Sequence, residues 1–267
     1  MGNTSREIVK DTLLFNNPSR VPCEIFYSNW AKNKYPQIIN KIQNRFPNDI
    51  IVVDNQYKKS SKVKGNKNRI GKYIDEWSCE FVNIKDGMIG EVKKPLLKNL
   101  SEWKKINPPY ELLPDNSNKF NNLVNNFCKN SNKFVRAKCI PRPWERYQLI
   151  RGTENALMDC VSEDENFFHL LNLIHKYYIK EFEIWARTAV DGMMFMDDWG
   201  SQNQMMISPK LWRTIFKPLY REYCEIAHSH GKFVFMHSDG YIMDIFEDLI
   251  EIGVDAINSQ LFCMDIE

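Results

Sequence analysis

Glycine is scarce in this sequence, with 11 residues in a chain of 267. Neither the GxGxxG pattern of dinucleotide-binding folds nor the GxxxxGK[ST] pattern of P-loops occurs. Both patterns need glycine because the backbone must approach a phosphate closely. Their absence argues against a Rossmann nucleotide site and against a P-loop.

Long apolar runs and an excess of one charge are missing as well. No stretch approaches the roughly 18 consecutive apolar residues of a membrane-spanning helix. The start of the chain lacks the basic and apolar regions of a secretory signal. The 36 basic residues nearly balance the 34 acidic ones, which gives a net charge of +2. We therefore expect no membrane span, and the charge balance gives no electrostatic reason to bind nucleic acid.

The seven cysteines do not form a recognisable framework. They are scattered, and no two have the CxxC spacing of a zinc or redox motif. This usage is typical of reduced thiols, so we expect a cytoplasmic protein. Apolar residues make up 43% of the chain and charged residues 26%, as in globular proteins with a substantial core. We expect a single domain over residues 1–267.

Short apolar segments alternate with helical patterns along the chain. Capping signals predict helices that begin after Thr4, near Ser162 and after Ser208. An antiparallel hairpin is expected as an insertion at about residues 73–97. The core strands are expected at residues 21–26, 49–54, 134–140, 193–196, 233–236 and 256–257. Continuous apolar strands separated by helices predict an α/β protein with parallel β/α units.

Polar and aromatic side chains follow these strands. Asp197 and Asp198 come directly after the fourth strand, and His237 and Asp239 follow the fifth. In (β/α) barrels the active site lies at the C-terminal ends of the strands, so these residues are the first candidates for the site. The other candidates are Trp30, Asp54, Arg142, Trp144, Trp199, Gln202 and Gln260.

Several longer segments resemble the uroporphyrinogen decarboxylase superfamily, and within it the branch that contains the cobamide-dependent methyltransferases. The resemblance spans nearly the whole chain, and its most specific part runs from DDWGSQ to HSDG. The segments are SREIVKDTLLFNNPSRVP, DEWSCEFVNIKDG, RGTENALMD, DGMMFMDDWGSQNQMMISPKLWRTIFKPLY, HSHGKFVFMHSDG and LIEIGVDAIN. The resemblance implies a (β/α)₈ TIM-type barrel.

The methyltransferase branch implies a particular chemistry. Its members use a His-x-Cys motif after the fifth strand to hold zinc, which binds a thiol and favours the thiolate. Here the motif reads His237-Ser238-Asp239, and residues i and i+2 of a strand point to the same side. The resemblance thus implies zinc as a cofactor held by His237 and Asp239. It also implies methylcobamide as a substrate, or as the cofactor of a corrinoid-binding partner protein. Asp197 and Asp198 would bind the metal, activate the small-molecule substrate or move protons.

Decarboxylation of uroporphyrinogen in porphyrin biosynthesis is the alternative that the superfamily implies. It would use Asp54 and Asp197 to stabilise a protonated pyrrole, without a cofactor. The decarboxylases carry an arginine-rich segment after the first strand, where this chain reads Tyr27-Ser28-Asn29-Trp30. Few cations remain at the mouth, Arg142 among them, to pair with the carboxylates of a tetrapyrrole.

The strand count sets a further expectation. About six of the eight β/α units of a complete barrel are present, so we expect a C-terminally truncated chain. Its open sheet edges would favour oligomerisation and low activity. A non-catalytic remnant that only binds a ligand is therefore a further alternative. Glycoside hydrolysis is disfavoured because adjacent Asp197 and Asp198 side chains diverge on a strand.

Overall fold

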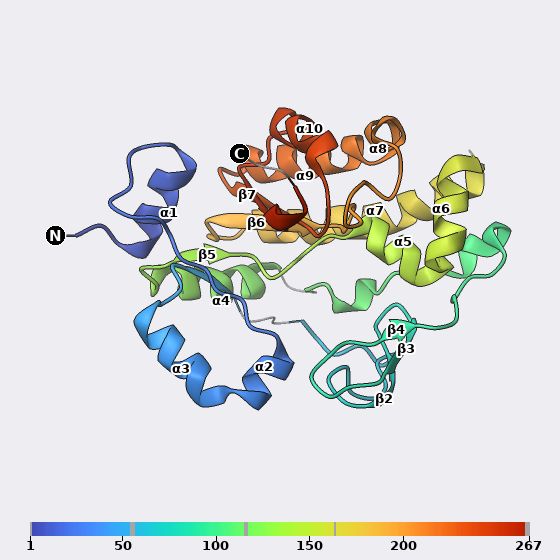
Figure 1. The fold of residues 1–267 in the computed structure, drawn as a ribbon, viewed down its shortest axis with the longest axis horizontal. Helices are drawn as coiled ribbons and strands as arrows, with labels where there is room; N and C mark the ends of the chain where they lie inside the picture. The colour runs from blue at the N-terminus through green and yellow to red at the C-terminus, as the bar shows by residue number, and fades with distance from the viewer. Residues whose placement is uncertain (1, 54–56, 115–116, 163, 265–267) are drawn as a thin grey trace.

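A computed structural model describes residues 2–53, 57–114, 117–162 and 164–264 of the protein (Figure 1). Five parallel strands form one sheet in the order β1-β5-β6-β7-β8, and three antiparallel strands form a second sheet in the order β2-β3-β4. The first sheet consists of β1 (Ile50–Val52), β5 (Phe134–Arg136), β6 (Gly192–Met196), β7 (Phe233–Ser238) and β8 (Ala256–Ser259). The second consists of β2 (Gly71–Ile74), β3 (Glu80–Asn83) and β4 (Glu91–Val92).

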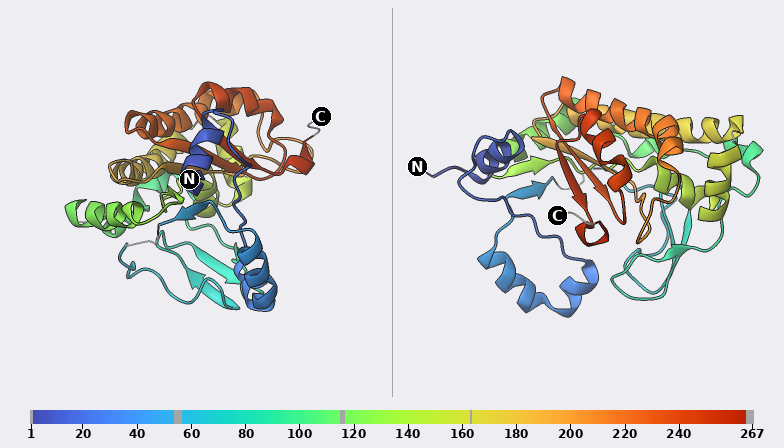
Figure 2. Two further views of the ribbon diagram at one scale, coloured as in Figure 1. Left: turned by 90° about the vertical axis from the view of Figure 1, so that its left-hand side faces the viewer. Right: turned by 45° about the horizontal axis from the view of Figure 1, so that its top comes forward.

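Helices enclose the parallel sheet. Figures 1 and 2 show α7–α10 along one side of it, whereas α2, α3 and the antiparallel sheet lie on the other side. None of the helices that the structure describes has the length and apolar character needed to cross a bilayer. The α-helices are α1 (Ser5–Leu13), α2 (Asn29–Lys34), α3 (Pro36–Arg45), α4 (Ser117–Lys129), α5 (Pro143–Arg151), α6 (Thr153–Ser162), α7 (Glu165–Ala186), α8 (Pro209–Ile215), α9 (Lys217–Ser229) and α10 (Phe246–Glu251). Short 3₁₀ turns occur at η1 (Leu100–Lys105), η2 (Tyr110–Leu112), η3 (Met243–Ile245) and η4 (Leu261–Cys263).

The two faces of the parallel sheet bury different sets of side chains. Alternate residues of β6 and β7 point to opposite faces, as the two-residue period of a strand requires. On the inner face, Ile50, Phe134, Met194 and Phe235 form a small cluster that Val9 of α1 covers. The outer face belongs to the main core beneath the helices. This curled sheet with an inner and an outer layer is part of a TIM-type barrel, which confirms the expected fold class.

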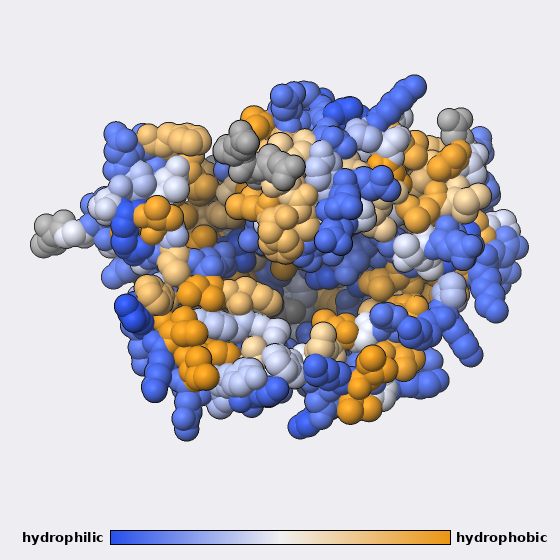
Figure 3. Space-filling model, in the orientation of Figure 1, coloured by the Kyte–Doolittle hydropathy of each residue, from blue (hydrophilic) through white to orange (hydrophobic). Residues whose placement is uncertain are grey.

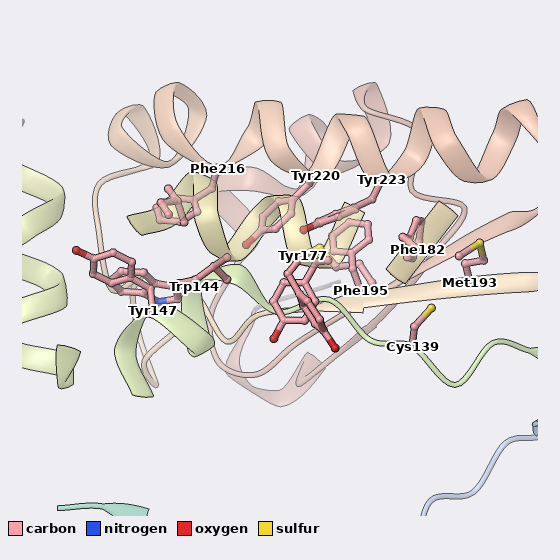
Figure 4. Packing of buried hydrophobic residues seen from close by; sticks show 14 of the residues in the cluster. Cys139, Trp144, Tyr147, Tyr177, Phe182, Met193, Phe195, Phe216, Tyr220 and Tyr223 are labelled. Carbon is pink, nitrogen blue, oxygen red and sulfur yellow. The ribbon is translucent and has the colours of Figure 1, made fainter. Parts of the chain in front are cut away.

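Aromatic rings fill much of the outer layer. Phe195 of β6 stacks on Tyr220 of α9 with a centroid distance of 5.0 Å, and Tyr223 lies 5.6 Å from the same ring (Figure 4). These side chains are fully buried, and aromatic side chains bury large apolar areas. The packing of α9 against β6 therefore fixes the backbone from which the next loop departs.

Two expected helix starts are confirmed by their caps. Thr4 accepts a hydrogen bond from the Glu7 backbone, and the Glu7 carboxylate accepts one in return from the Thr4 amide, which completes a capping box. Ser208 accepts from the amide of Leu211, and Pro209 occupies the first turn of α8. The expected hairpin is also present, with β3 and β4 antiparallel and β2 as an additional strand.

Two expectations about secondary structure are wrong. The first concerns residues 21–26, which form no strand, so the parallel sheet has five strands where the sequence suggested six. The backbone amides of Cys23 and Ile25 donate to the side chains of Asp49 and Asn48, at 2.7 and 2.9 Å, so neither amide is free to join a ladder with β1. Apart from one backbone bond, from the Asp49 amide to the Cys23 carbonyl at 2.7 Å, these side-chain contacts replace the expected strand pairing.

The second correction concerns the start of α7. Ser162 is the last residue of α6, and Asp164 caps α7 by accepting a hydrogen bond from the amide of Asn166. An aspartate next to the helix start thus takes the place expected for Ser162, since Asp and Ser are comparable N-cap residues.

Candidate metal centre at the ends of β6 and β7

The loops that follow β6 and β7 are joined by backbone hydrogen bonds. The amide of Asp197 donates to the carbonyl of His237 at 3.1 Å, and the amide of Gly200 donates to the carbonyl of Asp239 at 3.1 Å. The Asp239 amide donates to Asp198 Oδ1 at 2.9 Å. These bonds continue the parallel pairing beyond the strands and hold residues 197–200 beside residues 237–240.

Two glycines allow the loops to cross at close range. A Cβ atom on Gly200 would lie 2.1 Å from the Tyr241 amide nitrogen, and one on Gly240 would lie 2.2 Å from the Gly200 carbonyl oxygen. Gly240 also has a φ of +77°, which side-chain-bearing residues rarely adopt. The Asp198-Trp199-Gly200 and Asp239-Gly240 sequences therefore fit together only with glycine at these points.

Three side chains converge above this crossing. One ligand atom each from Asp198, His237 and Asp239 lies within 4.8 Å of the others. His237 Nε2 is 3.8 Å from Asp198 Oδ1 and 3.6 Å from Asp239 Oδ1. The two carboxylates are about half exposed and the imidazole is more covered. The structure thus brings together both residues predicted as metal ligands and one of the predicted catalytic aspartates.

The second ring nitrogen of His237 fixes how the imidazole is oriented. His237 Nδ1 lies 3.0 Å from the backbone carbonyl of Asn258 on β8 and 2.6 Å from the Asn258 side-chain oxygen. A carbonyl oxygen only accepts, so the hydrogen is on Nδ1 and Nε2 of the neutral ring presents its lone pair. Nε2 is the nitrogen that faces the two carboxylates. Metal-binding histidines have this arrangement, in which the other ring nitrogen donates to a carbonyl.

The donor set fits a divalent cation. Two carboxylates and one imidazole supply two negative charges and three ligand atoms, and zinc accepts both ligand types. The set lacks the thiolate of the methyltransferase motif and is harder, so zinc competes with manganese or ferrous iron at such donors. In catalytic zinc sites three protein ligands leave one position for water or substrate.

Asp197 faces away from this cluster and into the protein. Its carboxylate accepts hydrogen bonds from the amides of Trp144 and Glu145, at 3.0 and 2.7 Å, and from the Tyr220 hydroxyl at 2.7 Å. The residue is fully buried, and burial raises the pKa of its carboxyl group while the three donors oppose that rise. Asp197 therefore links the end of β6 to the first turn of α5, and no substrate touches it in this arrangement.

The two tryptophan candidates are also in the core. Trp144 and Trp199 are fully buried and stack with centroids 5.2 Å apart and planes 10° apart. Trp199 Nε1 donates to the Tyr220 hydroxyl at 2.9 Å. From this position the two tryptophans support the loop after β6. They could contact a ligand only if the core opened.

The remaining candidates lie around the site or outside the described residues. Gln260 Oε1 accepts from the Gly240 amide at 3.1 Å, so it supports the loop that carries Asp239. Arg142 precedes α5 and pairs with Glu145 at 3.0 Å. Trp30 on α2 has Lys34 and Lys85 Nζ each 4.8 Å from its ring centroid. Gln202 is exposed in the loop after β6. Asp54 lies outside the described residues.

Two residues of the site were not singled out from the sequence. Asn258 directly follows the last expected strand, and its bond to His237 depends on the parallel register of β7 and β8. Tyr220 lies on α9, far along the chain from Asp197, and a tyrosine in an apolar helix face looks like core packing. The strand-end position was the available signal for Asn258, and no local signal existed for Tyr220.

The centre of the face in Figure 1 is hollowed, and hydrophilic surface lines much of the hollow (Figure 3). The C-terminal ends of β6 and β7 carry the three converging side chains at the barrel mouth, the part of the fold where (β/α) enzymes bind substrates. The fold and the site together define an α/β half-barrel with a carboxylate–imidazole cluster at its mouth.

Comparisons with known proteins agree with this class. Residues 139–261 match the family model of uroporphyrinogen decarboxylase (URO-D). This match covers less than half of the chain, and it confirms the superfamily resemblance expected from the sequence. A search of curated proteins found no match. A solved structure of a methyltransferase from Methanosarcina mazei is similar, with a TM-score of 0.58, 11% identity, and coverage of 96% of this chain and 75% of that chain. At this identity the likeness shows a shared fold alone.

Proposed function

We propose that the protein is a methyltransferase-type enzyme of the URO-D superfamily that transfers a methyl group from a methylcobamide to a thiol. The convergence of Asp198, His237 and Asp239 at the barrel mouth carries this proposal. The likeness to a methyltransferase fold supports it. The methylcobamide would be a free substrate or be carried by a corrinoid-binding partner protein.

The reaction needs a thiolate and a methyl group in line with it. The thiol releases its proton to solvent, the sulfur forms a bond to the methyl carbon, and the cobalt–carbon bond breaks. The electron pair of that bond stays with cobalt, which changes from Co(III) to Co(I). A zinc ion held by Asp198, His237 and Asp239 would supply Lewis-acid chemistry that lowers the pKa of the thiol.

The chain itself supplies orientation and charge. Asn258 holds the His237 ring with Nε2 toward the cluster. The Asp239 amide donates to Asp198 Oδ1, so one aspartate positions the other. The two carboxylates balance the charge of a dication, and their exposure leaves the cluster open to a substrate. These features suit a metal ion that binds one thiol molecule after another at the same position.

The family match favours a second candidate, the decarboxylation of uroporphyrinogen. That reaction would require a carboxylate that faces a pyrrole. The Asp197 carboxylate is fully buried and has three hydrogen-bond donors, so it is unavailable for this role as arranged. Asp54, the other carboxylate of this alternative, lies outside the described residues, so the preference for methyl transfer rests on the position of Asp197 and on the converging cluster.

Metal binding and turnover test the proposal together. A calorimetric titration with zinc, together with elemental analysis of the loaded protein, is expected to show one ion per chain. Asp198→Asn and Asp239→Asn are expected to weaken binding by about tenfold or more. Glu247→Gln, an exposed acid on α10, serves as the control and leaves binding unchanged. The zinc-loaded protein is expected to demethylate methylcobalamin in the presence of a thiol. The change in cobalamin absorbance measures this reaction.

Three results would contradict the proposal. Equal zinc binding by both aspartate variants and the control would show that Asp198 and Asp239 do not bind the ion. Failure of the zinc-loaded protein to demethylate methylcobalamin with any thiol would remove the activity. Formation of coproporphyrinogen from uroporphyrinogen would establish the decarboxylase instead.

A further inference from the structure

Three isoleucines form a row at one end of the antiparallel sheet. Gly71 of β2 pairs with Asn83 of β3, so the next residues along the two strands, Ile70 and Ile84, lie opposite each other. The register between β3 and β4, continued in the same direction, places Ile89 on the other side of Ile84. Directly opposite residues of antiparallel strands are neighbours on the same face. The three side chains therefore lie next to one another across the sheet.

This isoleucine row is open to solvent. The exposed fractions of Ile70, Ile84 and Ile89 are 66%, 85% and 62%, and the neighbouring Met88 is also exposed. The opposite face of the sheet is covered, since Phe81 of β3 belongs to the main core. Figure 3 shows hydrophobic surface between hydrophilic side chains over this sheet. Apolar residues that adjoin one another on a surface indicate a binding site, whereas single scattered ones do not.

The backbone beside the row is held by one buried side chain. The Asn83 amide group donates to the carbonyls of Lys67 and Arg69, each at 2.9 Å, and its side-chain oxygen accepts from the Gly90 amide at 2.8 Å. Asn83 itself is buried. It thus joins the loop before β2 to the loop after β3, so the isoleucines project from a well-connected framework.

The segment that carries the row is strongly basic. Residues 58–98 contain eleven lysines and arginines and five acidic residues, a net charge of +6, whereas the whole chain has a net charge of +2. Lys67, Arg69 and Lys85 lie in the two loops beside the row, and all three are exposed. Figure 2 shows that the antiparallel sheet lies at the periphery of the molecule. The positive charge is therefore concentrated around the isoleucine row.

We infer that this end of the antiparallel sheet binds the surface of an anionic membrane. The isoleucine side chains would enter the boundary between the head groups and the acyl chains. The surrounding lysines and arginines would stay among the lipid phosphates, which attract them. A surface contact of this kind needs no membrane-spanning helix. It is also independent of the proposed methyl transfer.

Other classes of partner fit the row less well. A stable protein interface covers about 800 Å² on each partner and is enriched in aromatic residues, which is more than three aliphatic side chains supply. Single-stranded nucleic acids stack their bases on aromatic rings, and the row contains none. A membrane surface needs only a few apolar side chains, because the attraction of basic residues to anionic lipids adds to their effect.

Sedimentation with lipid vesicles tests the inference on the full chain. Vesicles of equal amounts of phosphatidylglycerol and phosphatidylcholine are expected to bind the protein about tenfold or more tightly than vesicles of phosphatidylcholine alone. An increase in ionic strength from about 0.1 M to about 1 M should weaken this binding, because the Debye length falls from about 10 Å to about 3 Å.

Two pairs of variants separate the apolar and the electrostatic contributions. Ile84→Asp is expected to weaken vesicle binding by about tenfold or more, since it removes an apolar side chain and adds a negative charge. Ile250→Asp, at a similarly exposed isoleucine of α10, is its matched control. Lys67→Glu is also expected to weaken binding by about tenfold or more, because each unit of charge near the surface contributes about fivefold. Lys210→Glu, at an exposed position of α8, is the second control.

The results lead to distinct conclusions. Loss of vesicle binding in Ile84→Asp and Lys67→Glu, with both controls unchanged, would support the inference. Absence of binding to the phosphatidylglycerol vesicles, or equal binding by all variants, would overturn it. Light scattering that shows a dimer in the wild type and a monomer in Ile84→Asp, without vesicle binding, would overturn it in favour of a second copy of the chain. Urea unfolding of each variant checks that it is folded, which these exposed positions allow.

Discussion

The Tyr220 hydroxyl donates a hydrogen bond to the Asp197 carboxylate at 2.7 Å and accepts one from Trp199 Nε1 at 2.9 Å. Asp197 and Trp199 flank Asp198 in the sequence, so a single hydroxyl on α9 holds both neighbours of a candidate metal ligand. Tyr220 is fully buried and touches no solvent. We conclude that the helix layer positions Asp198 through this buried contact.

Tyr220→Phe should therefore destabilise the protein and loosen the metal centre. The change leaves the Trp199 indole N–H without a partner and removes one of the two hydrogen bonds to Asp197 Oδ2, which keeps the Trp144 amide. An unsatisfied buried polar group costs about 1–3 kcal/mol. The free energy of unfolding from urea titration is expected to fall by that amount, together with zinc affinity. Tyr35→Phe, on an exposed ring, is the control and should change neither. Unchanged stability and affinity in Tyr220→Phe would show that the contact does not position the loop.

Glu181 gives the stability of the protein a pH dependence. It is buried on α7, and burial raises its pKa from 4.5 to about 7, although a hydrogen bond with Tyr57 and the charge of Arg142 oppose the rise. The folded chain thus holds a proton that the unfolded chain releases between these pH values. Stability must therefore decrease as the pH rises from about 4.5 to 7, which is the reverse of the usual effect of a salt-bridged carboxylate.

Glu181→Gln should remove this loss. The variant is expected to match the wild type near pH 4 and to exceed it above pH 8 by on the order of 3 kcal/mol, from 1.36 kcal/mol for each pH unit. Urea unfolding at a series of pH values measures the difference. Glu183→Gln, at a more exposed position of the same helix, is the comparison and should show no such trend. A difference that does not vary with pH would contradict the role of Glu181.

The sequence predicted the periodic features of this fold well. β6 and β7 were recognisable because continuous apolar residues precede polar ones, and the caps at Thr4 and Ser208 mark helix starts through local hydrogen bonds. The same reasoning failed at residues 21–26, which look like a strand. There the amide partners are the side chains of Asn48 and Asp49, more than 20 positions away, and no local pattern encodes such a contact.

The candidate site was predictable in part for the same reason. His237 and Asp239 are two residues apart on one strand, so their common direction follows from the period of the strand. The roles of Asp197 and Asp198 could not be separated from the sequence because adjacent side chains diverge and either could face the mouth. The structure resolves this ambiguity, since Asp197 points to α5 and α9 whereas Asp198 joins the cluster.

The antiparallel sheet should depend on one buried ion pair. Asp75 accepts hydrogen bonds from the amides of Trp77 and Cys79, at 3.0 and 2.8 Å, and pairs with buried Arg146 of α5. Asp75→Ala leaves the Arg146 charge buried without that partner, so a loss of about 3–5 kcal/mol is expected. Trypsin should then cut sooner after Lys93.

The exposed Arg69–Asp86 pair provides the comparison for this change. Its side chains are 71% and 52% exposed, and pairs of this kind contribute at most about 1 kcal/mol. Asp86→Ala should leave both the unfolding free energy and the trypsin pattern nearly unchanged. Equal effects of Asp75→Ala and Asp86→Ala would show that the buried pair does not attach the sheet to α5.

The crossing of the two site loops should fail when Gly240 gains a side chain. Gly240 and Gly231 both have positive φ angles, of +77° and +67°, so alanine is strained at either position by about 1 kcal/mol. A Cβ atom on Gly231 meets nothing within 4 Å, whereas one on Gly240 would lie 2.2 Å from the Gly200 carbonyl oxygen. Gly240→Ala should therefore cost clearly more than Gly231→Ala in urea unfolding, and it alone should weaken zinc binding, because Asp239 must move with its neighbour. Equal losses for the two variants would mean that backbone strain, and not the contact between the loops, sets the requirement for glycine.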